Sequence, residues 1–349
     1  MKKLIYDLDH KAIQKILNSW EEPDYRADQL WTGLYRHLWA TPQEFTTLSL
    51  DLRDRLDNEF VFSHLQPAKV IRAKDGLTKK TLFHLPDGES IETVLMHYPY
   101  KDRPDRNTVC ISTQVGCAMR CSFCATGQMG FHRQLSSGEI VEQVLISARF
   151  LKQSGETLTN VVVMGMGEPF HNYDATIDAL RRLNHPEGMN IGARRFTIST
   201  VGLVPEIRRF AQEDLQVNLA ISLHATEDDL RSSLLPINDQ YPIREVIKAC
   251  QDYIDITNRR VTFEWALIQN VNDSHEEASK LAQLLQGMLA HVNIIPLNPT
   301  QKYAGKGSPK ERVLDFQATL EERGIPCSIR HRRGMEIQAG CGQLASSNV

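Results

Sequence analysis

Three cysteines in the first half of the chain form the residue group with the clearest chemistry. Cys117, Cys121 and Cys124 have the spacing C-x3-C-x2-C, and no fourth cysteine lies nearby. An iron–sulfur cluster with four irons needs four ligands, and cysteine usually supplies all of them. Three thiolates therefore leave one iron open, much as a catalytic metal site keeps a free coordination position. An open iron can bind a small molecule and pass it an electron, so the spacing indicates a catalytic [4Fe-4S] cluster.

A structural zinc site is the alternative interpretation of this loop, with His132 as its fourth ligand. Zinc motifs, however, usually come as two ligand pairs separated by a dozen or more residues. Here the cysteines are bunched, and the loop around them contains Gly116, Phe123, Gly127 and Gly130. These residues suit a compact loop that wraps a bulky cluster, so the cluster is favoured over zinc.

The composition is that of an ordinary globular protein, with 41% hydrophobic and 24% charged residues among 349. A chain of this length can bury one large domain and a smaller one. It contains no run of about 18 apolar residues, so no membrane span is expected. Asp7 and Asp9 come too early for a signal peptide. Seven cysteines without a secretion signal indicate reduced thiols and a cytoplasmic protein.

Basic residues gather in two places although the net charge is only −3. One group lies between residues 101 and 133, where Asp102 and Asp105 are the acidic residues set against it. It comprises Lys101, Arg103, Arg106, Arg120 and Arg133. The other is Arg330-His331-Arg332-Arg333. Each is either a solvated face or, if both border the cysteine loop, a positive funnel for a polyanion. The sequence leaves both interpretations open.

The first part of the chain, residues 1–66, is predicted to be a small helical domain. Asp9 precedes an amphipathic stretch that ends near Trp20, and residues 23–26 open a second one. Thr41 and Glu44 form a capping box with proline at the first helical position, which predicts a third helix. Residues 67–106 then change to short alternating runs at 68–72, 80–83 and 90–95, with turn signals between them. This pattern predicts a short antiparallel sheet.

From residue 107 to 349 the pattern alternates between strand and helix. Capping boxes at Ser136/Glu139 and Ser274/Glu277 mark two of the helices. The alternation predicts an α/β fold with a parallel sheet, in the form of a partial (βα)6-type barrel. The expected strands are 108–112, 160–164, 196–199, 217–222, 261–268, 292–296 and 327–330.

Polar residues and glycines recur where these strands end, which is the edge at which such folds place their chemistry. The second strand runs into Gly165-Met166-Gly167-Glu168-Pro169, and the third into Ser199-Thr200-Val201-Gly202. The fourth ends at Ser222-Leu223-His224, and the sixth is followed by Asn298. Each signal alone is weak, because glycines and caps end strands everywhere. Their recurrence at one edge predicts a site there.

Taken together, these motifs resemble the radical S-adenosylmethionine (SAM) adenine methyltransferases of ribosomal and transfer RNA, the RlmN/Cfr family. The resemblance covers residues 10–345 and includes the cysteine loop and the strand ends above. Further matching segments are Leu235-Pro236-Ile237-Asn238, Val271-Asn272-Asp273 and Gly340-Cys341-Gly342-Gln343-Leu344. Many radical SAM families share the three cysteines but lack this last segment, so the combination is specific.

The resemblance implies a role for each matching residue. Cys117, Cys121 and Cys124 would bind the [4Fe-4S] cluster, and SAM would bind its open iron. Cys341 would carry a methyl group as S-methylcysteine, Cys110 would resolve the intermediate, and Glu92 would be the proton acceptor. The residues implied to contact SAM are Gly167, Glu168, Ser199, Ser222, Leu223, His224 and Asn298.

The family mechanism uses two SAM molecules per turnover, because C2 of adenine is too electron-poor to attack a methyl group. One SAM methylates Cys341; the other is cleaved by one electron, and the resulting radical takes hydrogen from the S-methyl group. The methylene carbon adds to adenine, Glu92 removes the ring proton, and Cys110 releases the product by forming a disulfide. The implied substrates are 23S rRNA in its peptidyl-transferase region and tRNA next to the anticodon. A flavodoxin-type electron donor and a monomeric enzyme are also expected.

Some residues have simpler interpretations or depart from the family pattern. Without the resemblance, Cys110 is a buried strand cysteine and Glu92 an exposed strand carboxylate, while Cys250 and Cys327 are expected in the core. Glu336 stands where aspartate is usual, and Gly340 stands for alanine and is expected to loosen its loop. Pro169 favours the C2 enzymes over the C8 relatives.

The RNA-binding part is predicted to lie in the amino-terminal helices and the small sheet. Their aromatic residues either stack on bases or belong to the core: Trp20, Trp31, Tyr35 and Trp39. The alternatives to a C2 methyltransferase are a C8 enzyme, a radical SAM activase that makes a glycyl radical, a methylthiotransferase and a zinc RNA-binding module. An activase would not need Cys341, and a methylthiotransferase would need three further cysteines before the loop.

Overall fold

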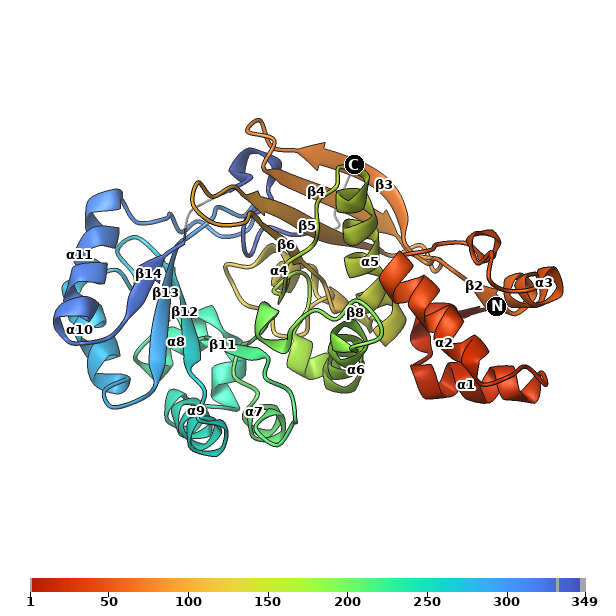
Figure 1. The fold of residues 1–349 in the computed structure, drawn as a ribbon. Helices are drawn as coiled ribbons and strands as arrows, with labels where there is room; N and C mark the ends of the chain where they lie inside the picture. Colours follow the sequence, from red (N-terminus) through yellow and green to blue (C-terminus); the bar gives the residue numbers. More distant parts are fainter. Residues whose placement is uncertain (1, 331–332, 346–349) are drawn as a thin grey trace.

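The computed structural model describes residues 2–330 and 333–345. Its central feature is one ten-stranded sheet, in the order β14-β13-β12-β11-β10-β9-β6-β5-β4-β3 (Figure 1). The first seven of these strands run parallel. Because β14 lies at one end of the order, the barrel is open, and the predicted α/β fold with a partial barrel is confirmed. The parallel strands are β6 (Arg106–Cys110), β9 (Asn160–Val163), β10 (Phe196–Thr200), β11 (Asn218–Ser222), β12 (Val261–Leu267), β13 (Ala290–Pro296) and β14 (Cys327–Ile329).

Amphipathic helices cover the outside of these strands (Figure 1). The predicted capping is visible at the helix starts: Ser136 and Glu139 form the predicted box. At the second predicted box, the Ser274 side chain accepts from the Glu277 amide. The covering helices are α5 (Ser137–Gln153), α6 (Tyr173–Asn184), α7 (Val204–Phe210), α8 (Asp228–Leu234), α9 (Ile243–Thr257), α10 (His275–Leu284) and α11 (Lys310–Glu322).

The predicted antiparallel strands continue the barrel sheet. They are β3 (Gln66–Arg72), β4 (Thr78–His84) and β5 (Ser90–Tyr98). Gly76 and Gly88 have positive φ angles of 71° and 86° in the turns between them, a conformation that glycine adopts without strain. β5 pairs with β6, and this register sets Val94 opposite Cys110. Residues on one face of β5 therefore look toward the same space as Cys110.

The amino-terminal region is helical, with one difference from the expectation. It contains α1 (His10–Ser19), α2 (Tyr25–Thr32), a π-helical turn (Gly33–His37) and α3 (Leu50–Glu59), and β1 (Lys3–Leu4) pairs with β2 (Phe60–Val61). The capping box at Thr41 is present but opens only one 3-10 turn, Pro42–Glu44. The chain leaves the helical path there because Phe45 is buried against Trp39 and Phe62. The third helix begins instead after Ser49, whose side chain caps it.

The aromatic residues of these helices belong mainly to the core. Trp31 and Tyr35 are each 1% exposed, and their rings lie 4.2 Å apart. Trp20 and Trp39 are partly buried against the same core. Trp31 and Tyr35 are thus not available for stacking on RNA bases. Among the described residues, no helix is long and apolar enough to cross a membrane.

Candidate active site

The three cysteines lie on a loop that a short hairpin holds at the mouth of the barrel. The hairpin consists of β7 (Gln114–Gly116) and β8 (Phe131–Gln134), and Cys124 precedes α4 (Ala125–Met129). Gly116 has φ +71°, and a Cβ there would lie 1.9 Å from the Gly130 carbonyl oxygen. Only glycine therefore allows the two strands to approach this closely. Cys117 follows directly, and its amide donates to the same Gly130 oxygen at 2.8 Å.

The spacing of the thiols fits a cluster better than a zinc ion. Tetrahedral zinc with bonds of about 2.3 Å holds sulfurs about 4 Å apart. Among the described residues, only His10, Asp28 and Glu187 bring three ligand atoms within 4.8 Å of one another, so the three cysteine sulfurs are set wider. His132 is bound instead to Glu89, at 2.9 Å. The donor set thus suits a group with several metal atoms.

Burial keeps these thiols protonated until metal binds. It raises the pKa of Cys117 to about 12 and that of Cys121 well above its usual value, and it raises the pKa of Cys124 as well. Metal ligation requires thiolates, so loading the cluster must release these protons.

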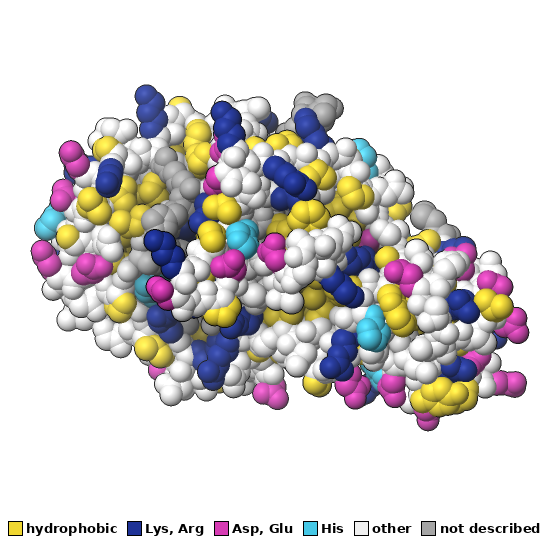
Figure 2. Space-filling model, turned by 45° about the horizontal axis from the view of Figure 1, so that its top comes forward, with side chains coloured by type: hydrophobic (Ala, Val, Ile, Leu, Met, Phe, Trp, Pro, Cys, Tyr) yellow, Lys and Arg dark blue, Asp and Glu magenta, His cyan; other side chains and the backbone are white. Residues whose placement is uncertain are grey.

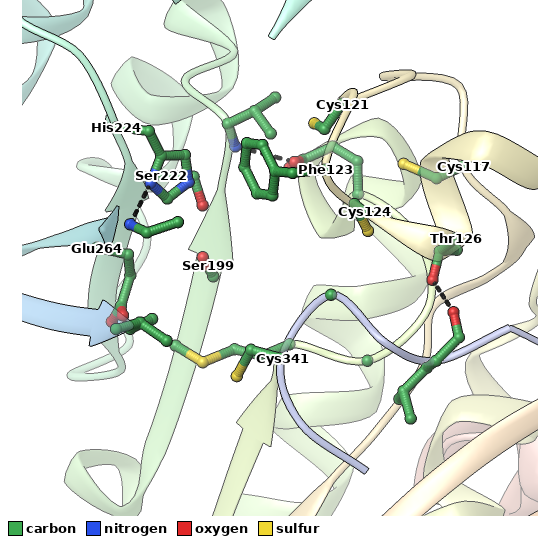
Figure 3. Close-up of a pocket in the computed structure, with 18 of the residues that line it drawn as sticks. Cys117, Cys121, Phe123, Cys124, Thr126, Ser199, Ser222, His224, Glu264 and Cys341 are labelled. Carbon is green, nitrogen blue, oxygen red and sulfur yellow. Dashed lines mark hydrogen bonds between the residues drawn. The ribbon is translucent and has the colours of Figure 1, made fainter. Parts of the chain in front are cut away.

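A cavity of about 1010 Å³, its open mouth included, lies beside the cysteine loop at the carboxyl ends of the strands. Figure 3 shows the cysteine loop on one side and the ends of β11 and β12 on the other, with Cys341 reaching between them. The predicted residues that line it are Cys117, Cys121, Cys124, Gly167, Glu168, Ser199, Ser222, His224, Asn298 and Cys341. Leu223 is fully buried and does not line it.

Glu168 fastens the end of β9 to the end of β10. Its carboxylate accepts from the amides of Phe170 and Val201, each at 3.0 Å. Its own amide donates to the Gln114 side chain at 2.7 Å. Burial raises the pKa of Glu168 to about 7. Gly167 before it has φ +104° and lines the cavity with little more than backbone.

His224 is held in an unusual backbone conformation, with φ +62°. Asn272 supports it by donating to the His224 carbonyl at 2.8 Å, and the His224 Nδ1 accepts from the Ala266 amide at 2.9 Å. Burial lowers the pKa of His224 to about 3, so the ring is a neutral acceptor at physiological pH. The ring meets Phe123 of the cysteine loop edge-on at 5.0 Å. The Val271-Asn272-Asp273 motif therefore shapes the site without lining it.

Arg231 on α8 is a positioning residue that sequence reasoning missed. It is fully buried and donates to the carbonyls of Val201 at 2.6 Å, Leu223 at 3.1 Å and Ser222 at 3.2 Å. It also donates to Asn238 Oδ1 at 2.9 Å. One guanidinium thus ties the ends of β10 and β11 together. The only sequence signal was the adjacent Leu235-Pro236-Ile237-Asn238 motif, whose asparagine is one of its partners.

The carboxy-terminal loop is attached to both sides of the cavity. Asn298 Nδ2 donates to the Cys341 carbonyl at 3.0 Å, and the Ala125 amide donates to the Gly342 carbonyl at 2.7 Å. A Cβ at Gly340 would lie 2.5 Å from Asn298 Nδ2. Gly340 is therefore closely packed, and the expectation that it loosens the loop is wrong. Asn298 Oδ1 is buried without a partner among the described residues, which leaves an acceptor for a ligand such as SAM.

Cys110 and Cys341 both line a second, smaller cavity that shares several lining residues with the first. Cys110 is buried at the end of β6 and Cys341 is half-buried. Burial and the neighbouring Cys341 raise the pKa of Cys110 to about 12. Arg330 lines both cavities. Cys250 is fully buried and Cys327 packs against the core, as predicted.

Glu92 is a buried residue, which contradicts its interpretation as an exposed strand carboxylate. It is 5% exposed, pairs with Lys80 at 2.8 Å and accepts from the Ala345 amide at 3.0 Å. Burial raises the pKa of Glu92, and the pairing with Lys80 opposes that rise. Glu92 lines neither cavity, although its side chain lies on the same face of the sheet as Val94, opposite Cys110.

Residues of the two basic groups in the sequence differ individually in their surroundings. Arg133 is neutralised by Asp87 and Glu139. Arg330 and Arg333 lie next to the cavities. His331 and Arg332 fall outside the described residues.

Comparison with known proteins agrees with this geometry. Residues 111–282 match the family model described as "Radical SAM superfamily". The open barrel and the three-cysteine loop therefore define a radical SAM enzyme, which implies a [4Fe-4S] cluster and SAM as its cofactors. A solved radical SAM methyltransferase from Sphaerobacter thermophilus superimposes with a TM-score of 0.95 at 50% identity, over 99% of this chain and 100% of that one.

Curated relatives narrow the assignment. Probable dual-specificity RNA methyltransferases RlmN are 46% identical in Roseiflexus castenholzii and 48% identical in Chloroflexus aurantiacus. The matches cover 98% and 99% of this chain, and 95% and 93% of the relatives. The chain belongs to the RlmN family of SAM-dependent radical methyltransferases.

Proposed function

We propose that this enzyme methylates C2 of adenine in RNA, with 23S rRNA and tRNA beside the anticodon as its substrates. The observation that carries the proposal is the position of Cys341, which borders the cavity beside the cysteine loop as well as the cavity of Cys110. A thiol in this position can meet a methyl donor and an RNA base. The names of the relatives support RNA as the methyl acceptor.

The cluster and SAM carry the difficult chemistry. When bound, they supply a methyl group, one electron and a hydrogen-abstracting radical, with two SAM molecules used per turnover. Cys117, Cys121 and Cys124 would hold the cluster. The residues that would hold SAM are Gly167, Glu168, Ser199, Ser222, Leu223, His224 and Asn298.

The protein's own groups perform the remaining steps. The Cys341 thiolate takes a methyl group and later joins the adenine C2 through the methylene carbon. Glu92 accepts the ring proton, and the one unpaired electron of the adduct would return to the cluster. The Cys110 thiolate then attacks the Cys341 sulfur, so an S–S bond forms and the C–S bond breaks; the carbon keeps the electron pair of that bond, gains a proton and leaves with the RNA as a methyl group. The Cys110–Cys341 disulfide is more oxidised than the two free thiols by two electrons. An external thiol reductant must therefore reduce it before the next turnover.

Pro169, which resembles the C2 enzymes, favours C2 over C8; it begins a 3-10 turn beside Glu168 and lines the cavity. We also propose that residues 1–66 and 67–106 assist in RNA binding, that a flavodoxin-type protein donates the electron, and that the enzyme works as a monomer.

Mass spectrometry tests the proposal directly. The protein is reconstituted anaerobically with iron and sulfide, then given SAM, a reductant and an adenine-containing RNA. We expect a methyl group on Cys341 and 2-methyladenosine in the RNA; 8-methyladenosine would assign the C8 reaction instead. A loaded cluster and SAM cleavage with Cys341 never methylated would contradict the mechanism.

A matched pair of variants isolates the resolving step. In Cys110→Ser, the RNA should remain covalently bound to Cys341, visible as a shifted band that nuclease removes. Cys327→Ser, at a half-buried cysteine outside the site, should release its product normally. Release of methylated RNA by Cys110→Ser at the normal rate would exclude Cys110 as the resolving residue.

A further inference from the structure

Two arginines from distant parts of the chain meet on one tyrosine at the rim of the smaller cavity. Tyr98 ends β5 and lines this cavity together with Cys110 and Cys341. The Arg106 guanidinium lies 4.2 Å from the centre of the Tyr98 ring, and that of Arg333 lies 4.5 Å from it. Arg106 stands opposite Tyr98 in the strand register. Cation–π contact thus gives both side chains a fixed place.

Neither arginine is neutralised by the protein. No carboxylate oxygen lies within 4.0 Å of Arg106 or Arg333 among the ion pairs of the described residues. The nearby Asp105 and Glu156 face His97, at 3.5 Å and 3.4 Å. The Nε of each arginine is buried without a hydrogen-bond partner in the described part of the chain.

These features differ from those of an ordinary structural arginine. Arg133, in the same basic group of the sequence, is bound by two carboxylates. Within the part of the chain that the structure describes, Arg333 donates one hydrogen bond, to the His97 carbonyl at 3.3 Å. Two unneutralised cations on one ring repel each other, and a bound anion relieves that repulsion. Planar guanidinium groups that are already ordered suit the oxygens of a phosphate.

The location suggests which anion this is. Arg333 and Tyr98 line the cavity that holds Cys110 and Cys341, into which the proposed reaction requires an RNA base to enter, and Arg106 lies against the Tyr98 ring beside it. A base taken out of its stack brings the phosphates of its own strand to the rim of the pocket. Figure 2 shows several Lys and Arg side chains on one face of the molecule, with Asp and Glu side chains among them. RNA is thus the partner whose charge complements the rim.

We infer that Arg106 and Arg333, ordered by Tyr98, bind a backbone phosphate of the RNA strand next to the adenine that enters this cavity. The inference rests on the proposed function, since it takes RNA as the substrate. Arg106 and Arg333 act on binding and on the placement of the base, and neither takes part in the methylation of Cys341.

RNA binding at several salt concentrations tests the inference. A fluorescent RNA hairpin with one adenine in its loop is titrated with reconstituted enzyme, and anisotropy gives Kd. We expect Arg106→Gln and Arg333→Gln each to weaken binding about fivefold to tenfold and to reduce the slope of log Kd against log salt by roughly 0.7. Arg106→Lys keeps the charge and should retain the slope. Arg312→Gln, at an exposed position on α11, is the matched control and should change neither value.

A second measurement separates this inference from the proposed function. Methylation of Cys341 needs no RNA, so mass spectrometry should show it unchanged in both glutamine variants. Unchanged methylation also shows that both variants fold and bind the cluster and SAM. Normal Kd and salt slope in both variants would overturn the inference and leave the arginines a structural role. Weaker binding with an unchanged slope would also overturn it, because no phosphate contact would have been lost. If the wild type binds RNA but never methylates it, the proposed function fails while the binding result stands.

Discussion

Lys80 and Glu92 form a buried ion pair, with side-chain exposures of 9% and 7%. A carboxylate taken out of water binds a proton more readily, and a neighbouring ammonium opposes this. Lys80 also donates to the Gln338 carbonyl at 3.3 Å, in the segment that leads to Cys341. We therefore expect Lys80 to keep Glu92 ionised for its proposed role as proton acceptor.

Replacing Lys80 should move the pH dependence of methyl transfer to RNA. In Lys80→Met the pKa of Glu92 rises further, because burial then acts without the opposing charge. We expect the rate at neutral pH to fall, because a larger fraction of Glu92 is then protonated, and to recover as the pH is raised. Single-turnover rates across pH measure this. Lys80→Arg keeps the charge and should retain the wild-type profile; an unshifted profile in Lys80→Met would contradict the role of Lys80.

Glu168 should make the stability of the cofactor-free protein depend on pH. Its pKa is about 7 in the folded chain, against an ordinary value near 4.3. The folded state therefore binds more protons than the unfolded state between these pH values. The contribution of Glu168 to the free energy of unfolding is thus complete at low pH and is lost as the pH rises toward 7. The loss amounts to roughly 3 kcal/mol. Urea unfolding at pH 5 and pH 7.5 should show this decline in the wild type and a smaller one in Glu168→Gln; equal declines would contradict the prediction.

At the scale of elements, the site depends on groups that join strand ends. Glu168 connects β9 to β10, Asn272 supports the turn after β11, and Arg231 ties β10 to β11. Each side chain donates to or accepts from backbone atoms of another element. The positions of the residues that line the cavity are thus set by residues that mostly do not line it.

Shortening Arg231 should separate these strand ends. Lysine has one ammonium in place of a planar fork, so Arg231→Lys leaves buried carbonyls without donors. We expect a loss of about 3 kcal/mol in the free energy of unfolding and a SAM affinity at least tenfold lower in the reconstituted enzyme. Chemical denaturation and calorimetric titration measure the two effects. Arg244→Lys, at an exposed position on α9, is the control. If the two variants had the same free energy of unfolding and the same SAM affinity, the hydrogen bonds of Arg231 to the strand ends would not be needed.

The sequence predicted the elements that local patterns encode. The seven parallel strands, the turns at Gly76 and Gly88 and the helix cap at Ser136 follow from alternation and capping, and the structure contains them. The capping box at Thr41 was misleading, because the same hydrogen bonds open a 3-10 turn when the next residue, Phe45, packs into the core. Local signals mark where a turn begins, but tertiary packing decides how far it continues.

The residues that sequence reasoning missed act through contacts between distant segments. Arg231 resembles any charged residue of a short helix until its carbonyl partners on two strands are known. Glu92 alternates like an exposed residue, yet Lys80 and the Ala345 amide cover it. Gly340 suggests flexibility, yet its packing against Asn298 fixes it. Periodicity in the sequence does not indicate that a residue is buried by a remote part of the chain.

At the scale of the whole molecule, the amino-terminal helices share one hydrophobic core with the barrel. The Gly138 amide at the start of α5 donates to Asp7 at 2.8 Å, and Arg149 donates to the Leu38 carbonyl at 2.8 Å. Glu142 of α5 accepts from the His64 amide at 2.9 Å, in the segment before β3. Whether residues 1–66 form a separate helical domain, as predicted, therefore depends on whether they unfold independently of the barrel.

We expect residues 1–66 to unfold together with the barrel. Three of the four tryptophans, Trp20, Trp31 and Trp39, lie in this region, and Trp265 lies in β12. In Trp265→Phe, fluorescence thus reports on the amino-terminal helices alone, while far-UV circular dichroism reports on the whole chain. The two urea transitions of the cofactor-free protein should coincide, because separating the helices exposes apolar surface on α5 and leaves the Asp7 and Glu142 contacts unmade. A fluorescence transition at clearly lower urea would show instead that residues 1–66 are an independent unit, which could move when RNA binds.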